Sequence, residues 1–307
     1  MRRWKAHRGK VASLSFARDG RLLASVTGSG RDVFVWDAPT GELVRKLEVP
    51  SDYPDLAFAV AHDVAFAPDA DLVAVARERR VEVLNTTNWS LRHRNEYADF
   101  IGVPLRVKFG PGTAPLLASA TARRVNLWRL PKKGGGRLKN VGEFPSGERM
   151  ALAFSPDGGR LCTADGYTAA TVWDTNTGKR LVRSKLLRGP VDYNPRNGEL
   201  AARRLPGPRP VVLPAGDWAD PPTPVVIFPP PAAPNDYHLQ LRWLPDGKTL
   251  LGTTRNGRVE VWEAATGLPV RTFDMGVGKL AAADVSPNGT LAAVGGATGE
   301  VVVWDLE

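Results

Sequence analysis

Cysteine and histidine are scarce in this sequence of 307 residues. It has one cysteine, Cys162, and four histidines scattered along the chain. A single cysteine excludes an intramolecular disulfide and a cysteine-based zinc site. The histidines include no pair at the i, i+4 spacing that holds catalytic zinc on a helix. We therefore expect no metal and no other cofactor, and we expect Cys162 to be a core residue rather than a nucleophile.

Long apolar runs are also missing. No segment approaches the roughly 18 apolar residues that a membrane span needs. The basic N-terminus has no apolar segment behind it that would mark a signal peptide. These absences predict a cytoplasmic protein without a membrane contact. The sequence has no Gly-x-Ser-x-Gly elbow and no outstanding carboxylate pair, so we also expect no enzymatic activity.

Acidic residues are outnumbered by basic ones, with a net charge of +9. Such a charge indicates an acidic partner or nucleic acid. The alternative is genome composition, because the chain has 30 Arg against 11 Lys and abundant Ala, Gly and Pro, as a GC-rich genome encodes. Composition alone leaves both explanations open.

A turn rich in Pro, Asp, Asn and Gly recurs along the whole chain. Its seven copies are ARDG (17–20), APDA (67–70), GPGT (110–113), SPDG (155–158), PRNG (195–198), LPDG (244–247) and SPNG (286–289). Proline presets the first dihedral of such a turn, Asp or Asn bonds to the backbone, and Gly accepts positive φ. An alternating strand precedes most copies and a second strand follows each one, so each turn predicts a β-hairpin.

A third strand follows each hairpin and ends in a common position, usually Trp. The seven positions are Trp36, Leu84, Trp128, Trp173, Leu213, Trp262 and Trp304. Several copies continue into a short fourth strand, as in TGELVRKL. The repeating unit is therefore a four-stranded antiparallel meander of about 44 residues.

These copies resemble the WD-repeat (WD40) family, whose four-stranded blades form a β-propeller. The resemblance implies an all-β fold, a seven-bladed β-propeller of four-stranded antiparallel blades, in a single domain of residues 1–307. It also implies a non-catalytic scaffold for protein interactions. The approximate blade bounds are 7–50, 51–94, 95–144, 145–187, 188–234, 235–275 and 276–307.

The last copy ends after its third strand, at VVVWDLE. Residues 2–5 (RRWK) resemble the fourth strand of blade six, VRTFD, and lie at the same distance from the next first strand. We therefore expect the N-terminal strand to complete the last blade and close the ring.

Residues that brace blades in the family are mostly absent here. The resemblance implies a His before the first strand and an Asp before the third, which bond with a Ser or Thr and the Trp. Only blade one has the histidine, His7, with Ser25 in the matching strand and Gly30 at the Asp position. We expect apolar stacking between neighbouring blades to stabilise the ring instead.

Blade five departs most from the pattern, because residues 206–234 hold 11 of the 26 prolines. Proline cannot donate to a ladder, so short strands and stiff loops are expected. A disordered linker between two domains is the alternative. The unbroken phase of the repeat favours a blade.

The turns between second and third strands carry arginines, and in a propeller these turns share one rim with the loops between blades. Loops fixed on a rigid scaffold often carry function. The candidate arginines are Arg31, Arg77, Arg79, Arg80, Arg123, Arg124, Arg203, Arg204, Arg255 and Arg258.

Tyrosines next to an acid mark the loops between blades, at Tyr53, Tyr97, Tyr193 and Tyr237, and Trp218 lies in the proline-rich insertion. Tyr, Trp and Arg are enriched at binding hot spots. We therefore predict that a protein or peptide partner, such as an acidic one, binds a monomeric propeller through this Arg/Tyr rim.

Three alternatives remain open at this stage. The arginines could bind nucleic acid or another polyanion. They could instead pair internally with neighbouring carboxylates while the tyrosines pack between blades. An enzyme of another propeller family would need ligand groups along the central channel, and the shortage of histidine disfavours it.

Overall fold

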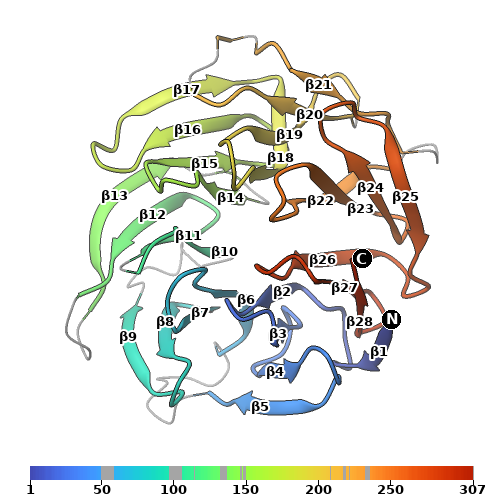
Figure 1. Cartoon of the computed structure of the whole chain (residues 1–307). Helices are drawn as coiled ribbons and strands as arrows, with labels where there is room; N and C mark the ends of the chain where they lie inside the picture. The colour runs from blue at the N-terminus through green and yellow to red at the C-terminus, as the bar shows by residue number, and fades with distance from the viewer. Residues whose placement is uncertain are drawn as a thin grey trace.

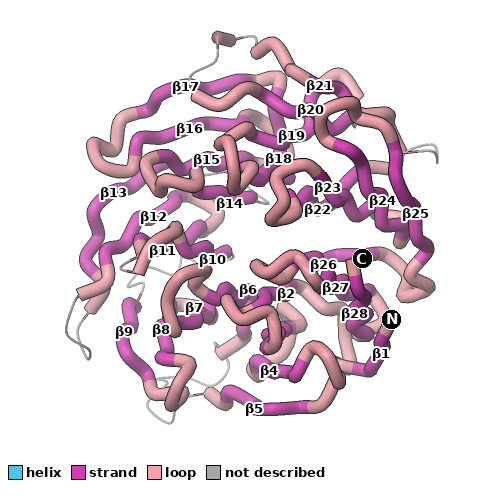
Figure 2. Tube along the Cα trace, viewed as in Figure 1, coloured by secondary structure: helices cyan, strands magenta, loops and turns pink. Residues whose placement is uncertain are grey.

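The computed structural model describes residues 1–49, 59–96, 106–113, 115–131, 137–145, 147, 150–207, 209–216, 219–220, 222–231 and 236–306. These residues form strands β1 to β28 and no helix (Figure 2). The strands make seven antiparallel sheets of four, arranged as blades around a ring (Figure 1). The all-β, seven-bladed architecture expected from the repeat is confirmed.

The strands of the first three blades follow one another in the chain. Blade one has β2 (Ser13–Phe16), β3 (Leu22–Val26), β4 (Val33–Asp37) and β5 (Leu43–Leu47). Blade two has β6 (Ala61–Phe66), β7 (Leu72–Arg77), β8 (Arg80–Asn85) and β9 (Leu91–Glu96). Blade three has β10 (Arg106–Phe109), β11 (Leu116–Ala120), β12 (Arg124–Arg129) and β13 (Lys139–Pro145).

The remaining blades keep this order, except that the last one takes its outer strand from the N-terminus. Blade four has β14 (Ala151–Phe154), β15 (Arg160–Ala164), β16 (Ala170–Asp174) and β17 (Arg180–Ser184). Blade five has β18 (Leu187–Tyr193), β19 (Leu200–Arg204), β20 (Arg209–Leu213) and β21 (Val226–Ile227). Blade six has β22 (His238–Trp243), β23 (Thr249–Thr254), β24 (Arg258–Glu263) and β25 (Pro269–Asp274). Blade seven has β26 (Leu280–Val285), β27 (Leu291–Gly296), β28 (Glu300–Asp305) and β1 (Arg2–Lys5).

Ring closure occurs between the two ends of the chain, as expected. Strand β1 pairs antiparallel with β28, with Arg2 opposite Val303 and Lys5 opposite Glu300 (Figure 1). The Arg3 guanidinium donates to the Glu300 carboxylate at 2.9 Å. This hydrogen bond lowers the pKa of Glu300 to about 2. A charged pair thus accompanies the backbone ladder that joins the ends.

The recurring turn forms as its residues predict. In blade four, the Asp157 carboxylate accepts from the Gly159 amide at 3.0 Å, and Gly158 has φ of +70°. The Ser155 hydroxyl accepts from the Arg160 amide at 2.9 Å. Side-chain acceptors and a left-handed glycine therefore close the hairpin between β14 and β15.

Seven apolar clusters hold the ring, and each is shared between two neighbouring blades. At the closure, Leu14 and Trp36 of blade one pack with Val301 and Val303 of blade seven, and Trp4 packs against them. This is the stacking expected of a repeat protein, in which each unit buries its faces against its neighbours.

Blade one has a buried hydrogen-bonded chain of three side chains. His7 Nε2 lies 2.8 Å from the Ser25 hydroxyl, and the Trp36 indole donates to the same oxygen at 2.8 Å. Burial lowers the pKa of His7 to about 4. The imidazole is therefore neutral at pH 7, which suits a hydrogen bond in an apolar setting.

Bracing extends further than the sequence indicated. In blade three the Trp128 indole donates to the Ser119 hydroxyl at 2.7 Å, and in blade four Trp173 donates to Thr163 at 2.9 Å. These blades keep the outer half of the braced chain without the histidine, because the adjacent second strand carries a Ser or Thr two positions after the residue opposite the tryptophan. The expectation that bracing is mostly missing thus holds for the histidine link only.

Blade five is a complete four-stranded sheet, with β21 reduced to two residues. Phe228 follows β21, is fully buried, and contacts Trp262 of blade six with ring centroids 5.3 Å apart. The proline-rich segment therefore covers a blade rather than linking two domains.

Candidate functional site

The described residues contain neither a cluster of metal ligands nor a membrane-spanning helix. No three His, Cys, Asp or Glu side chains in them gather as metal ligands. No helix in the described part of the chain is long and apolar enough to cross a membrane. Cys162 is fully buried, and burial raises its pKa to about 12, so its thiol is protonated and shielded.

The rim arginines differ sharply in their exposure. Arg31, Arg123, Arg255 and Arg258 are exposed, whereas Arg79, Arg124, Arg203 and Arg204 are half-buried. Arg124 pairs with Glu143 at 3.4 Å, and the Glu143 side chain is 52% exposed. Four of the ten sequence candidates therefore offer freely exposed guanidinium groups.

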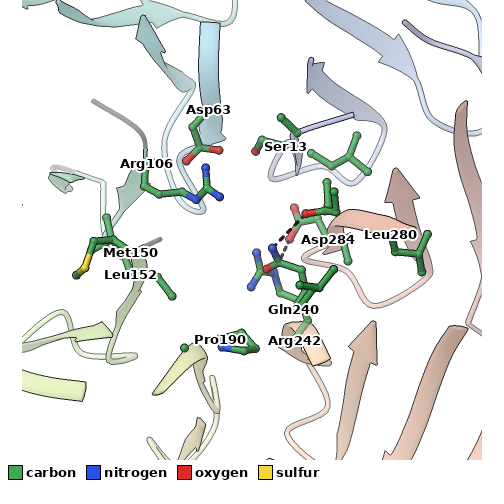
Figure 3. Close-up of a pocket in the computed structure, with 18 of the residues that line it drawn as sticks. Ser13, Asp63, Arg106, Met150, Leu152, Pro190, Gln240, Arg242, Leu280 and Asp284 are labelled. Atoms are coloured by element: carbon green, nitrogen blue, oxygen red, sulfur yellow. Dashed lines mark hydrogen bonds and ion pairs between the residues drawn. The ribbon is translucent and has the colours of Figure 1, made fainter. Parts of the chain in front are cut away.

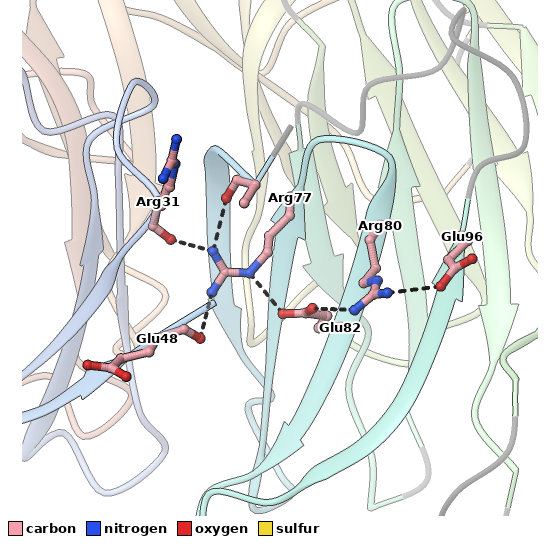
Figure 4. Close-up of polar contacts among 7 residues, drawn as sticks. Arg31, Glu48, Arg77, Arg80, Glu82 and Glu96 are labelled. Carbon is pink, nitrogen blue, oxygen red and sulfur yellow. Dashed lines mark hydrogen bonds and ion pairs between the residues drawn. The ribbon is translucent and has the colours of Figure 1, made fainter. Parts of the chain in front are cut away.

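Arg77 and Arg80 are instead buried inside blade two, with exposures of 1% and 2% (Figure 4). The Glu82 carboxylate lies between them and accepts from Arg77 at 2.9 Å and from Arg80 at 3.4 Å. Arg80 also donates to Glu96 at 2.9 Å. These two arginines are structural, as the alternative of internal pairing stated, and they present no contact surface.

Arg77 also binds the neighbouring loops of blades one and two. Its guanidinium donates to the carbonyls of Arg31, Ala59 and Glu48, the last two at 3.2 and 3.4 Å (Figure 4). Because every guanidinium nitrogen has an acceptor, the buried charge is neutralised and its donors are satisfied.

The aromatic candidates also divide. Tyr53, Tyr97 and Trp218 lie outside the described residues. Tyr193 is not in a loop between blades: it ends β18 at the opposite end of the strand and is buried among apolar residues. The sequence placed it wrongly because β18 starts at Leu187, several residues before the expected strand.

Tyr237 is the aromatic residue that the structure brings together with arginines. Its ring centroid lies 5.5 Å from the Arg203 guanidinium carbon and 5.8 Å from that of Arg255. Guanidinium groups at such distances interact favourably with the ring. Residues of blades five and six thus form an Arg–Tyr–Arg group at the rim.

This group lines part of a cavity of about 980 Å³ that runs along the first strands of the blades. Figure 3 shows residues that line this cavity. Among the described residues, the carboxylates that line the cavity are those of Asp63 and Asp284. The cationic residues that line it are Lys10, Arg106, Lys108, Arg203, Arg242, Arg255 and Lys279. Seven cations against two anions make the cavity strongly electropositive.

Both carboxylates of the cavity already have partners in the fold. Asp63 accepts from the Val107 amide of blade three at 2.8 Å. Asp284 accepts from the Phe16 amide of blade one at 2.8 Å and pairs with Arg242 at 3.5 Å (Figure 3). They therefore link adjacent blades, and most of the positive charge is not neutralised by them.

The loop candidates Arg203 and Arg255 line the cavity, but the prediction from loops did not include the other five cations, such as Arg106, Lys108 and Arg242 in the first strands. Alternate residues of a strand face the same side. In the first strand of blade three this places both Arg106 and Lys108 on the channel, and in blade six it places Gln240 and Arg242 there. The alternation of side chains along the innermost strands was the sequence signal that predicts these channel cations.

Comparison with known families agrees with the architecture. A family model described as WD domain, G-beta repeat, matches residues 1–37, which run from β1 to the end of β4. The chain is a seven-bladed propeller that carries the WD repeat. No curated protein matches the sequence.

The boundaries of the matched WD repeat are shifted by one strand from those of a structural blade. It begins in the outer strand of blade seven and ends in the third strand of blade one. This phase explains why closure of the WD-repeat propeller uses both ends of the chain. Propellers of this kind are generally non-catalytic scaffolds that bind other proteins.

Proposed function

We propose that this propeller is a non-catalytic scaffold that binds a protein partner at the Arg/Tyr rim and the electropositive central cavity. The observation that carries the proposal is the excess of seven cations over two carboxylates in the cavity, beside the Tyr237 group. Arg and Tyr supply both charge and flat contact area, as at binding hot spots. The partner is an acidic segment of a protein or peptide.

The exposed rim arginines provide the test. Arg31, Arg123 and Arg258 come from three different blades and expose their side chains. Changing all three to Glu reverses the rim charge without touching a buried contact, so each change alters stability by no more than about 0.5 kcal/mol. The experiment is affinity capture from the native host with the full chain as bait, followed by mass spectrometry.

A matched control carries the same charge change elsewhere. Arg129, Arg180 and Arg183 are exposed on the outer strands and at their turns. The rim variant is expected to lose the partner that the control variant retains. Equal capture by both variants contradicts the proposal.

Nucleic acid is the second candidate, and the same channel cations favour it. Binding to a polyanion releases counterions, so its affinity falls log-linearly and steeply with salt. An interface anchored by Tyr237 and its arginines responds less steeply. A steep salt dependence in binding to random-sequence RNA or DNA, together with no protein captured, would replace the first proposal by the second.

We also propose that the protein works as a cytoplasmic monomer. The proposal rests on a single, buried cysteine, as suits a reducing compartment, and on a ring closed by the chain's own N-terminal strand. Light scattering should give a mass near 33.2 kDa, and fractionation of the native host should recover the protein without membranes.

A further inference from the structure

Arg203 occupies a strand position where the other blades have small side chains. It is the third residue after Leu200, which pairs with the end of the first strand. The corresponding residues of the other blades are Val26, Ala76, Ala120, Ala164, Thr253 and Gly295. A long cation at a position that otherwise holds Ala or Val extends from blade five toward the loops of its neighbours.

The contacts of Arg203 leave its charge without a counterion. Its Nη2 donates weakly to the Gly166 carbonyl at 3.5 Å, and its buried Nε has no acceptor among the described residues. No carboxylate in the described ranges pairs with it. A half-buried guanidinium with unused donors is costly unless an acceptor arrives.

A second arginine lies directly opposite. Arg188 is the cross-strand partner of Arg203 and is buried, and it donates only to the carbonyls of Lys185 and Leu187. Burial lowers the pKa of both guanidiniums, and the charge of Arg188 lowers that of Arg203 further, although both stay protonated. Like charges directly opposite are unfavourable in a sheet.

The nearest carboxylates form no ion pair with Arg203. Burial lowers the pKa of Arg188, and the charge of Asp165 offsets part of that effect. Asp165 accepts from the amides of Tyr167 and Thr168 and from the Thr168 hydroxyl. Asp236 accepts from the amides of Tyr237 and Asn256 at 2.9 and 3.2 Å. Both carboxylates are therefore fixed by their own loops, and neither supplies Arg203 with an ion pair.

We propose that Arg203 and Arg255, which both lie against the Tyr237 ring and line the same cavity, form an oxyanion site for a phosphate or carboxylate side chain of the bound partner. Arg203 lines the cavity and pairs with no carboxylate among the described residues. Arg255 is exposed and carries no ion pair among the described residues, and Arg188 adds positive charge from the adjacent strand. Paired guanidinium donors fit planar carboxylates and phosphates. This inference rests on the proposed function and names the chemistry its partner carries at one point of the rim.

Short labelled Gly/Ser peptides test the site on the full chain. Three peptides differ only in a central pair of residues, which are phosphoserines, glutamates or glutamines, and binding is followed by fluorescence polarisation. Arg203→Gln and Arg255→Gln should each weaken binding of an anionic peptide about tenfold. Arg183→Gln, on an outer strand, is the matched control and should leave binding unchanged. The two anionic peptides distinguish phosphate from carboxylate.

Two results would overturn the site: wild-type protein that binds neither anionic peptide better than the glutamine peptide, or equal weakening by Arg183→Gln and Arg203→Gln. Tyr237→Phe should keep the affinity, since the ring remains, whereas Tyr237→Leu should reduce it. The scaffold proposal fails separately, when the rim variant captures as much partner as its control. If the native partner is captured but the anionic peptides do not bind, the oxyanion site is wrong. If the peptides bind but the rim variant captures as much partner as its control, the scaffold proposal is wrong.

Discussion

Arg77 is the last residue of the second strand of blade two, and Arg203 is the last but one of the second strand of blade five. The two arginines have opposite surroundings. Arg77 is 1% exposed and has Glu82 at 2.9 Å with three carbonyls around it. Arg203 has one long hydrogen bond and a tyrosine ring, and no carboxylate in the described part of the chain pairs with it. The same residue type on the same rim therefore serves the fold in one blade and remains chemically unsatisfied in the other.

The difference comes from the adjacent strand. In blade two the third strand places Glu82 against both arginines, so the charge is cancelled where it is buried. In blade five the third strand of RPVVL has no acid to offer. An arginine is thus structural or available for a ligand according to what its neighbouring strand supplies.

The largest effect should come from removing the acid in blade two. Glu82→Gln keeps the shape of the side chain and leaves two buried arginines without their shared carboxylate. The free energy of unfolding should fall by about 3–5 kcal/mol, as for other broken buried pairs. Urea unfolding followed by tryptophan fluorescence measures it. A loss below about 1 kcal/mol would show that the carbonyls alone satisfy Arg77.

His7 adds a third case to the comparison, a buried side chain that the fold keeps neutral. Its folded pKa is about 4, below the ordinary value of 6.5. Between these values the unfolded chain binds the proton and the folded chain does not, so stability falls as pH drops through this window. The loss should be about 1–3 kcal/mol by pH 4.

His7→Gln is the matching control, because an amide can still bond Ser25 and does not titrate there. Urea unfolding at a series of pH values should show a weaker pH dependence for this variant. An unchanged slope between pH 6.5 and 4 would assign the acid sensitivity to other groups.

Removing Arg203, which has no counterion among the described residues, should not destabilise the protein. Arg203→Met deletes a half-buried charge that has no counterion and fills a similar volume. We expect the free energy of unfolding to rise by up to about 1 kcal/mol. Arg77→Met should instead destabilise the protein strongly, because it leaves the buried Glu82 carboxylate without its Arg77 partner. Measured side by side in thermal unfolding, the two substitutions should differ in sign. Equal destabilisation would show that Arg203 is as structural as Arg77.

The smallest effect is expected at the exposed pair of Arg124 and Glu143, 3.4 Å apart. Glu143→Gln should change the free energy of unfolding by no more than about 0.5 kcal/mol, because water and salt screen exposed pairs. The same denaturation assay used for Glu82→Gln provides the measurement. A large loss here would mean that exposure is a poor guide to which rim arginines are structural.

The repeat could be predicted from sequence because its signals are local. Turn residues such as Asp157 and Gly158 act on their own hairpin, and the terminal Trp recurs at a nearly constant spacing. Closure by Arg2–Lys5 followed from the same spacing. The roles of the arginines could not be predicted, because Glu82 and Tyr237 act on them from other strands and other blades.

The sequence by itself determined the seven four-stranded blades and the meeting of the two ends, since hairpin turns and strand alternation depend on neighbours in the chain. Tertiary structure alone decided which cations are neutralised, because that depends on acceptors brought close by packing. It buried Arg77 and Arg80 around Glu82, placed seven cations along one central cavity, and set Arg203 and Arg255 against Tyr237. Electrostatic energy depends on distance and burial in space, and neither can be read from separation along the chain.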